Sequence, residues 1–132
     1  MIEFGHATHT GLRREHNEDT YWADAGLGLF LVADGMGGCG RGELAATIAR
    51  DALVDAARAG HALAPAIRGA SDAIAKRASA ASAASPMGAT LAVLQLDAGQ
   101  YRVASVGDNP VHLWQHGRLQ LIDGGCAGTN TT

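Results

Sequence analysis

The spacing of hydrophobic and polar residues predicts strands at the start of the chain. Residues 2–9 alternate loosely and predict a first strand, whereas residues 11–19 are polar and predict a charged turn. Two short strands are expected at residues 20–23 and 27–33. The second is almost wholly apolar, which is typical of a strand that is buried on both faces.

The middle of the chain changes to a helical period. Apolar residues recur at helical spacing from about Gly42, and the Ala-Gly pair at residues 59–60 predicts the end of this helix. A second helix is expected from about Pro65, which a first helical turn accepts, toward Ser82. Its Ala/Ser-rich end, residues 78–85, is expected to fray.

The pattern then returns to a period of two. Residues 89–96 and 100–106 predict one hairpin, and residues 111–114 and 118–122 predict another. The order of strands, two long helices and further strands predicts an α+β fold.

Length and composition fit one folded domain. The chain has 132 residues, of which 47% are hydrophobic and 17% charged, so it can bury a core. We expect residues 1–122 to form this domain. Residues 123–132 are rich in Gly and Thr without periodicity, and we expect them to form a disordered tail.

Charge and hydropathy exclude several classes of partner. Ten basic and thirteen acidic side chains give a net charge of −3 without a basic cluster, which argues against nucleic-acid binding. No apolar run is long enough to cross a membrane, and the N-terminus has no signal-peptide pattern. Two cysteines, Cys39 and Cys126, indicate free thiols in a reducing compartment. We therefore expect a cytoplasmic protein, of undetermined oligomeric state.

Carboxylates gather at turns beside strand ends. Glu18 and Asp19 share one turn, Asp34 ends an apolar strand, and Asp108 follows another. A single aspartate at a strand end is usually a cap or turn former. Several together favour a hard divalent cation such as Mg²⁺ or Mn²⁺, and Gly35 would let the backbone turn its carbonyl toward the same ion.

An arginine lies in the same turn as the first carboxylates. The guanidinium of Arg14 could hold a phosphate in a bidentate manner. On the pattern alone, an ion pair with Glu15 or Glu18 is the simpler interpretation of this arginine.

Four short segments resemble, in order, the sequence elements of one enzyme family. Residues 11–19 (GLRREHNED) are similar to its G-x-x-R-x-x-N-E-D element, and residues 32–38 (VADGMGG) to its V-x-D-G-M-G-G element. Residues 88–90 (GAT) and 106–109 (VGDN) resemble its G-[ST]-T strand start and its V-G-D-S turn. The ordered set resembles the PPM-type (protein phosphatase 2C-like) metal-dependent serine/threonine phosphatases. Met36, where eukaryotic members often carry histidine, resembles the bacterial type.

The resemblance implies a role for each acidic residue. Asp34 matches the carboxylate that bridges two Mn²⁺ or Mg²⁺ ions, and Gly35 matches the glycine whose carbonyl adds a ligand. Glu18 and Asp19 match acidic residues that hold metal-bound waters. Asp108 matches a carboxylate linked to a third, weaker metal ion in some members.

The resemblance also implies a reaction and its partners. Arg14 matches the arginine that holds the substrate phosphate, so Arg14 and Asp34 are the expected catalytic residues. Two ions roughly 3.5–4 Å apart would lower the pKa of a shared water, and the resulting hydroxide would attack phosphorus in line. The implied substrate is phosphoserine or phosphothreonine in a phosphoprotein, within a signalling pathway linked to a serine/threonine kinase.

The chain departs from the family pattern at its C-terminal end. Family members are longer, and their later D-G-[LV] and D-N elements, which supply further carboxylates, have no match here. Asn109 and Pro110 replace the serine of the V-G-D-S turn and the arginine that commonly follows it. The expected fold is part of an α-β-β-α sandwich with its C-terminal strands missing and its sheet edges exposed. We expect a truncated or shortened homologue with weak Mn²⁺ binding and impaired activity.

Three other interpretations stay open. A phosphatase-like domain without a full metal site could bind phosphoproteins without turnover, as a pseudophosphatase-like regulatory module. Residues 35–40 match the G-x-G-x-x-G nucleotide-binding pattern, although Asp34 would repel a pyrophosphate and Asp55 falls within a helical pattern. A zinc site is conceivable from four side chains whose spacing matches no closed-site pattern: His6, His9, His16 and Cys39.

Overall fold

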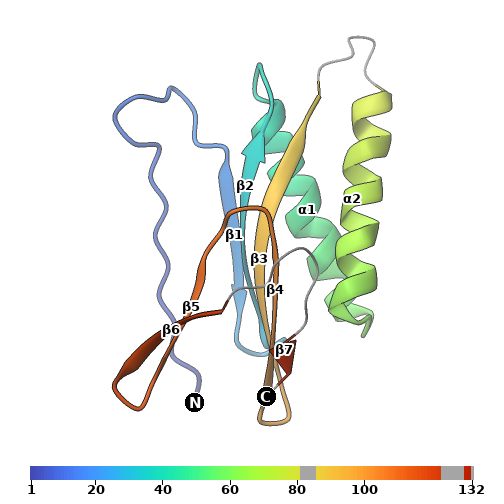
Figure 1. Cartoon of the computed structure of the whole chain (residues 1–132). Coiled ribbons are helices and arrows are strands. Elements are labelled where there is room, and N and C mark those ends of the chain that lie inside the picture. The colour runs from blue at the N-terminus through green and yellow to red at the C-terminus, as the bar shows by residue number, and fades with distance from the viewer. Residues whose placement is uncertain (81–85, 123–129, 132) are drawn as a thin grey trace.

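The chain folds into antiparallel strands and two helices (Figure 1). The computed structural model describes residues 1–80, 86–122 and 130–131. In chain order the elements are β1 (Asp19–Asp24), β2 (Leu29–Met36), α1 (Arg41–Arg58), α2 (Leu63–Ser79), β3 (Gly88–Asp97), β4 (Gln100–Val106), β5 (Val111–Gln115), β6 (Arg118–Ile122) and β7 (Asn130–Thr131). One sheet has the strand order β1-β2-β3-β4-β7, and a separate hairpin pairs β5 with β6. This arrangement confirms the predicted α+β class.

Both helices lie on one face of the larger sheet, with α1 against the strands and α2 against α1 (Figure 1). The helix α1 buries a row of small residues together with Leu53 and Val54, which lets its axis come close to the sheet. The core between the helices and the strands includes Leu29, Leu31, Leu53, Leu63, Leu91 and Val93. Within the described ranges, no helix is long and apolar enough to cross a membrane.

The predicted helices are confirmed, with small shifts at their ends. The helix α1 starts at Arg41 rather than Gly42 and ends at the predicted Ala-Gly pair. The helix α2 starts at Leu63 and ends at Ser79. Ala80 is the C-cap of this helix, whereas residues 81 and 82 of the predicted continuation and most of the fraying segment lie outside the described residues.

The expectation that the apolar strand is buried on both faces is wrong. In β2, Leu29, Leu31 and Ala33 are buried, whereas the side chain of Val32 is 50% exposed. The strand is also longer than predicted and continues to Met36. The helices cover only one face of this antiparallel sheet, so alternate residues of an apolar strand face outward.

The expectation of a first strand at residues 2–9 is also wrong. This segment has no strand pairing among the described residues. Its ring side chains instead pack on the sheet. Phe4 is edge-on to Phe30 with 5.4 Å between the ring centroids, and His6 is stacked on Tyr21 with 4.2 Å between the ring centroids. The alternation of the segment therefore serves side-chain contacts rather than a hydrogen-bonded ladder.

Both predicted hairpins are confirmed. Ala98 and Gly99 between β3 and β4 have φ values of 47° and 79°, and His116 and Gly117 between β5 and β6 have 51° and 76°. Two positive φ values in a two-residue loop match the twist of the flanking strands. Most of the predicted disordered tail lies outside the described residues. The two residues of this tail that the structure describes form β7, which pairs with β4.

Candidate functional site

The pairing of β1 with β2 brings two acidic residues together at one end of the sheet. Asp19 is the direct antiparallel partner of Asp34, so both side chains lie on the same face. This is the open face, opposite α1, and both residues are exposed. Successive residues of a strand face opposite sides, so Glu18, which precedes Asp19, and Gly35, which follows Asp34, lie toward α1.

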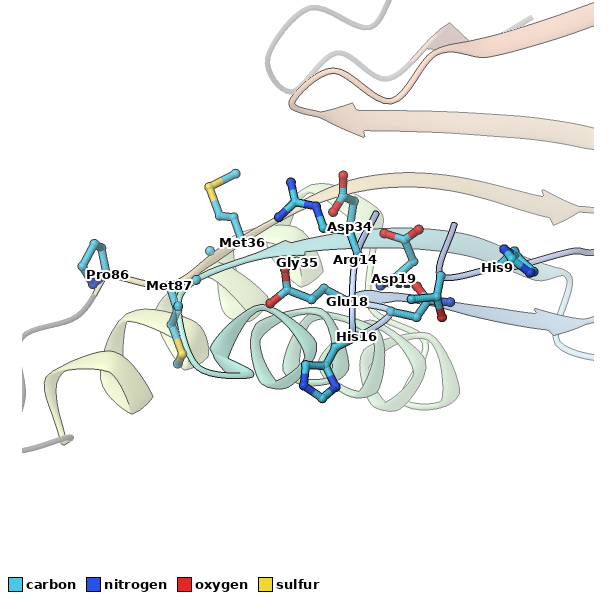
Figure 2. Close-up of a pocket in the computed structure, with 15 residues that line it drawn as sticks. His9, Arg14, His16, Glu18, Asp19, Asp34, Gly35, Met36, Pro86 and Met87 are labelled. Atoms are coloured by element: carbon cyan, nitrogen blue, oxygen red, sulfur yellow. Dashed lines mark hydrogen bonds between the residues drawn. The ribbon is translucent and has the colours of Figure 1, made fainter. Parts of the chain in front are cut away.

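A hollow of about 840 Å³ lies at this end of the sheet. Five of the six predicted site residues line it, namely Arg14, Glu18, Asp19, Asp34 and Gly35 (Figure 2). Figure 2 shows the Arg14 guanidinium beside the Asp34 carboxylate, and His16 pointing away from the carboxylates. His9, Met36 and Met87 also contribute to the wall. The guanidinium of Arg14 and several carboxylates thus share one open, polar hollow.

The electrostatics of the hollow act on Asp34. The carboxyl pKa of Asp34 is raised above its ordinary value of 3.8, first by partial burial and then by repulsion from Asp19. A hydrogen bond between the side chains of Asp19 and Asp34 and repulsion from Asp108 raise this pKa further, while Arg14 opposes the shift. Crowded carboxylates of this kind are the environment in which a bound cation would relieve repulsion.

Asp108 is near this group but does not line the hollow. The turn that carries it is tied to β2 through Thr90. The Asn109 side-chain amide donates to the Thr90 hydroxyl at 2.8 Å, and that hydroxyl donates to the Asp34 carbonyl at 3.4 Å. The Ser105 hydroxyl donates to the Asn109 carbonyl at 3.1 Å. Asn109, which departs from the family pattern, therefore fastens the turn of Asp108 to the strand of Asp34.

Two positioning features were missed by the sequence analysis. Asn17 accepts a hydrogen bond from the Asp19 backbone N–H at 3.0 Å and donates to the Thr8 hydroxyl at 2.7 Å. Gly42 of α1 lies against Glu18 and Gly35. Asn17 is the asparagine of the N-E-D element, so the sequence pattern could have indicated its role. Gly42 had no sequence signal beyond the start of a helix.

The donor chemistry fits a hard divalent cation, because the candidate ligands are carboxylates and one carbonyl. The donors divide into two pairs, with Asp19 and Asp34 on the open face and Glu18 with the Gly35 carbonyl on the helix side. Across the described residues, no group of three His, Cys, Asp or Glu side chains could hold a metal ion as placed. The residues present thus suit Mn²⁺ or Mg²⁺ in kind, while a closed set of side-chain ligands is not assembled.

The structure contradicts two of the alternatives. The zinc site of His6, His9, His16 and Cys39 is not formed, since these described residues make no group able to hold a metal and His6 is stacked on Tyr21. The nucleotide-binding interpretation requires a strand in a parallel β-α-β unit. The strand β2 is antiparallel to both of its neighbours, β1 and β3.

The simpler interpretation of Arg14 is wrong as well. Among the ion pairs of the described residues, none joins Arg14 to Glu15 or Glu18. The charge of Arg14 instead acts on Asp34 across the hollow. This leaves the guanidinium available to an anionic ligand at the same place.

Comparison with known proteins is consistent with this geometry. Residues 8–122 match the family model described as protein phosphatase 2C. A search of curated proteins finds no match.

Solved phosphatases share the fold. The serine/threonine phosphatase PstP/Ppp of Mycobacterium tuberculosis is 29% identical with a TM-score of 0.77, over 87% of this chain and 51% of that one. The catalytic domain of PstP in complex with two manganese ions is 31% identical with a TM-score of 0.79, over 87% and 52%. The PPM phosphatase MsPP of Mycobacterium smegmatis, in complex with cacodylate, is 28% identical with a TM-score of 0.76, over 89% and 50%. The chain thus spans about half the length of these solved structures.

Proposed function

This chain belongs to the protein phosphatase 2C family, and on that premise we propose that it takes part in the hydrolysis of phosphoserine and phosphothreonine in phosphoproteins. The observation that carries this proposal is the hollow that Arg14 lines together with Glu18, Asp19 and Asp34. A guanidinium facing carboxylates at an open strand end can hold a phosphate next to a cation.

Two Mn²⁺ or Mg²⁺ ions are the proposed cofactors, held by Asp34 and the Gly35 carbonyl, with Glu18 and Asp19 holding their waters. When bound, such ions supply an activated water and neutralise charge on the phosphoryl oxygens. In support, burial and repulsion from Asp19 and Asp108 raise the carboxyl pKa of Asp34, so negative charge is concentrated where a divalent cation would bind. We assign Asp108, which acts on Asp34 from outside the hollow, to a third and weaker ion.

The roles of the protein groups follow from their positions. Arg14 would bind two phosphate oxygens and orient the phosphorus toward Asp34. Asp34, opposite Asp19, would stay ionised in the presence of a cation and hold its place by its strand pairing. Asn109 and Thr90 would keep the turn of Asp108 at a fixed distance from Asp34.

We further propose that activity is impaired in this chain, because its own residues supply a divided set of donors. Residues 1–122 would form the partial phosphatase domain, in a bacterial, cytoplasmic signalling pathway that includes a serine/threonine kinase. The mycobacterial proteins similar to this chain carry serine/threonine phosphatase in their names, which supports the substrate class.

Calorimetric titration with Mn²⁺ and hydrolysis of a phosphothreonine peptide test the proposal. We expect weak Mn²⁺ binding and slow Mn²⁺-dependent phosphate release, both lost in Asp34→Asn and both kept in Asp97→Asn, which removes a charge at the far end of the sheet. Absence of both binding and release in the unaltered chain would overturn the proposal. Rapid release from p-nitrophenyl phosphate, abolished by Asp34→Asn, would show that the impairment is wrong.

One observation favours a second candidate function. Because no three acidic or histidine side chains of the described residues could hold a metal ion as placed, the chain could bind a phosphoprotein through Arg14 without turnover. In that case a phosphothreonine peptide would bind equally well in EDTA, and Arg14→Ala would abolish the binding. Binding that requires Mn²⁺ and ends in release would exclude this candidate.

A further inference from the structure

The end of β2 and the first turn of α1 meet at two glycines. Gly42 is buried, and a Cβ on it would lie 2.5 Å from Oε1 and 2.6 Å from Cδ of Glu18. The same Cβ would lie 2.8 Å from the carbonyl oxygen of Gly35. The space that a side chain would take at Gly42 is therefore filled by the Glu18 carboxylate and the Gly35 carbonyl.

The backbone at Gly42 does not itself require glycine. Gly40, two residues earlier, has a left-handed φ of 75°, whereas Gly42 lies within α1 and has no φ in that region. Inside a helix, alanine is favoured over glycine by about 1 kcal/mol. The glycine thus lowers helix stability at this position, and the space it leaves is used by its neighbours.

We propose that Gly42 is a positioning residue, which holds the Glu18 carboxylate against the Gly35 carbonyl. The inference rests on the proposed function, in which these two groups are the helix-side donors of the metal site. Glu18 is tied at its backbone, because the Gly35 N–H donates to the Glu18 carbonyl at 3.1 Å. A methyl group at Gly42 would therefore displace the flexible end of the Glu18 side chain, and the Gly35 carbonyl, 2.8 Å from the added Cβ, would also have to shift. The two donors would then separate.

A matched pair of glycine substitutions tests this. Gly69 lies in α2, is exposed, and a Cβ on it would meet nothing within 4 Å. Gly42→Ala and Gly69→Ala are thus the same change in two helices, one against Glu18 and one in open space. We expect Gly42→Ala to weaken Mn²⁺ binding by about 10- to 100-fold, as loss of a group that orients a metal ligand does. Gly69→Ala should leave Mn²⁺ affinity unchanged, and both variants should keep the circular dichroism of the unaltered chain.

A double-mutant cycle shows whether the effect passes through Glu18. If Gly42 acts by placing this carboxylate, Gly42→Ala should weaken Mn²⁺ binding by less than about twofold in a Glu18→Ala background. Equal losses in both backgrounds, or an unchanged Mn²⁺ affinity in Gly42→Ala alone, would overturn the proposal.

A metal-free measurement separates this inference from the proposed function. In EDTA, nuclear Overhauser contacts between the Gly42 α-protons and the Glu18 side chain should be present. In Gly42→Ala, contacts from the new methyl group should show the Glu18 carboxylate displaced from Gly35. If the unaltered chain binds no Mn²⁺ but shows these contacts and their loss, the proposed metal site fails and the positioning holds. Absence of the contacts in the unaltered chain overturns the positioning whatever the metal does.

Discussion

The two faces of the five-stranded sheet are built from the same strands but differ in what they do. On the face under α1, Leu29 and Leu31 of β2 are buried in the core. On the opposite face, Val32 of the same strand is half exposed, and Asp34 is exposed and lines the hollow. Side chains of one strand thus alternate between holding the fold and forming the site. The comparison predicts that the two properties can be changed separately.

The largest expected effect separates two adjacent residues of β2. Leu31→Ala should lower the free energy of unfolding by about 3 kcal/mol, because it removes buried methyl groups and leaves a cavity under α1. Val32→Ala should cost less than about 1 kcal/mol, because its side chain is already half in water. Urea unfolding followed by circular dichroism measures both. Similar losses for the two variants would show that the open face is covered in solution.

The second prediction concerns the open face at its acidic end. Asp34→Asn should weaken Mn²⁺ binding by more than the ~10- to 100-fold that loss of an outer-shell partner causes, because it removes a proposed ligand. The unfolding free energy in EDTA should not fall, since the substitution also removes repulsion from Asp19. Thermal unfolding with and without Mn²⁺ separates the two quantities, because binding to the folded state alone raises the midpoint. A large loss of stability in EDTA would contradict the division between the faces.

The sequence predicted the elements better than their layers. The hairpin at His116 and Gly117 and the alanine-rich helix α1 follow from local chemistry, turn residues and helical spacing, so both were found. The apolar composition of β2 could not tell whether one layer or two covers the strand, and the prediction of two-sided burial failed there. The rings of Phe4 and His6 produced an alternation that packs on the sheet without pairing.

The site was predictable as residue types but not as geometry. Its acidic residues stood at turns and strand ends, which is visible in one dimension. The pairing of Asp19 with Asp34 depends on the register of β1 on β2, which no local pattern specifies. Gly42 could not be found at all, because its importance lies in the absence of a side chain next to Glu18.

The third prediction tests the turn that holds Asp19. Asn17→Ala removes the acceptor of the Asp19 N–H and the donor to Thr8, and it should weaken Mn²⁺ binding by about tenfold. Thr8→Ala removes only the outer bond of this pair and should have a smaller effect. Calorimetric titration of both variants provides the measurement. A larger effect in Thr8→Ala would mean that Thr8, rather than the hydrogen bond from the Asp19 N–H to Asn17, determines the position of Asp19.

The smallest expected effect is the change of unfolding free energy with pH, and it concerns Asp34 on the open face. A raised carboxyl pKa means that folded Asp34 holds its proton to a higher pH than unfolded Asp34 does. The metal-free chain should therefore lose stability as pH rises through the folded pKa of Asp34. The loss should stay below about 1 kcal/mol because the carboxyl is exposed and screened. Asp34→Asn cannot ionise, so it should equal the unaltered chain in acid and become the more stable of the two toward about pH 7.

Thermal midpoints in EDTA across this pH range give the difference between the two chains, and Asp97→Asn supplies the effect of removing one charge elsewhere. With Mn²⁺ present the dependence should reverse, because protons compete with the ion for the same carboxylate and binding weakens as pH falls. A difference between the unaltered chain and Asp34→Asn that does not change with pH would show that Asp19 and Asp34 are not crowded in the free protein. The open face would then lack the repulsion on which its proposed affinity for a cation rests.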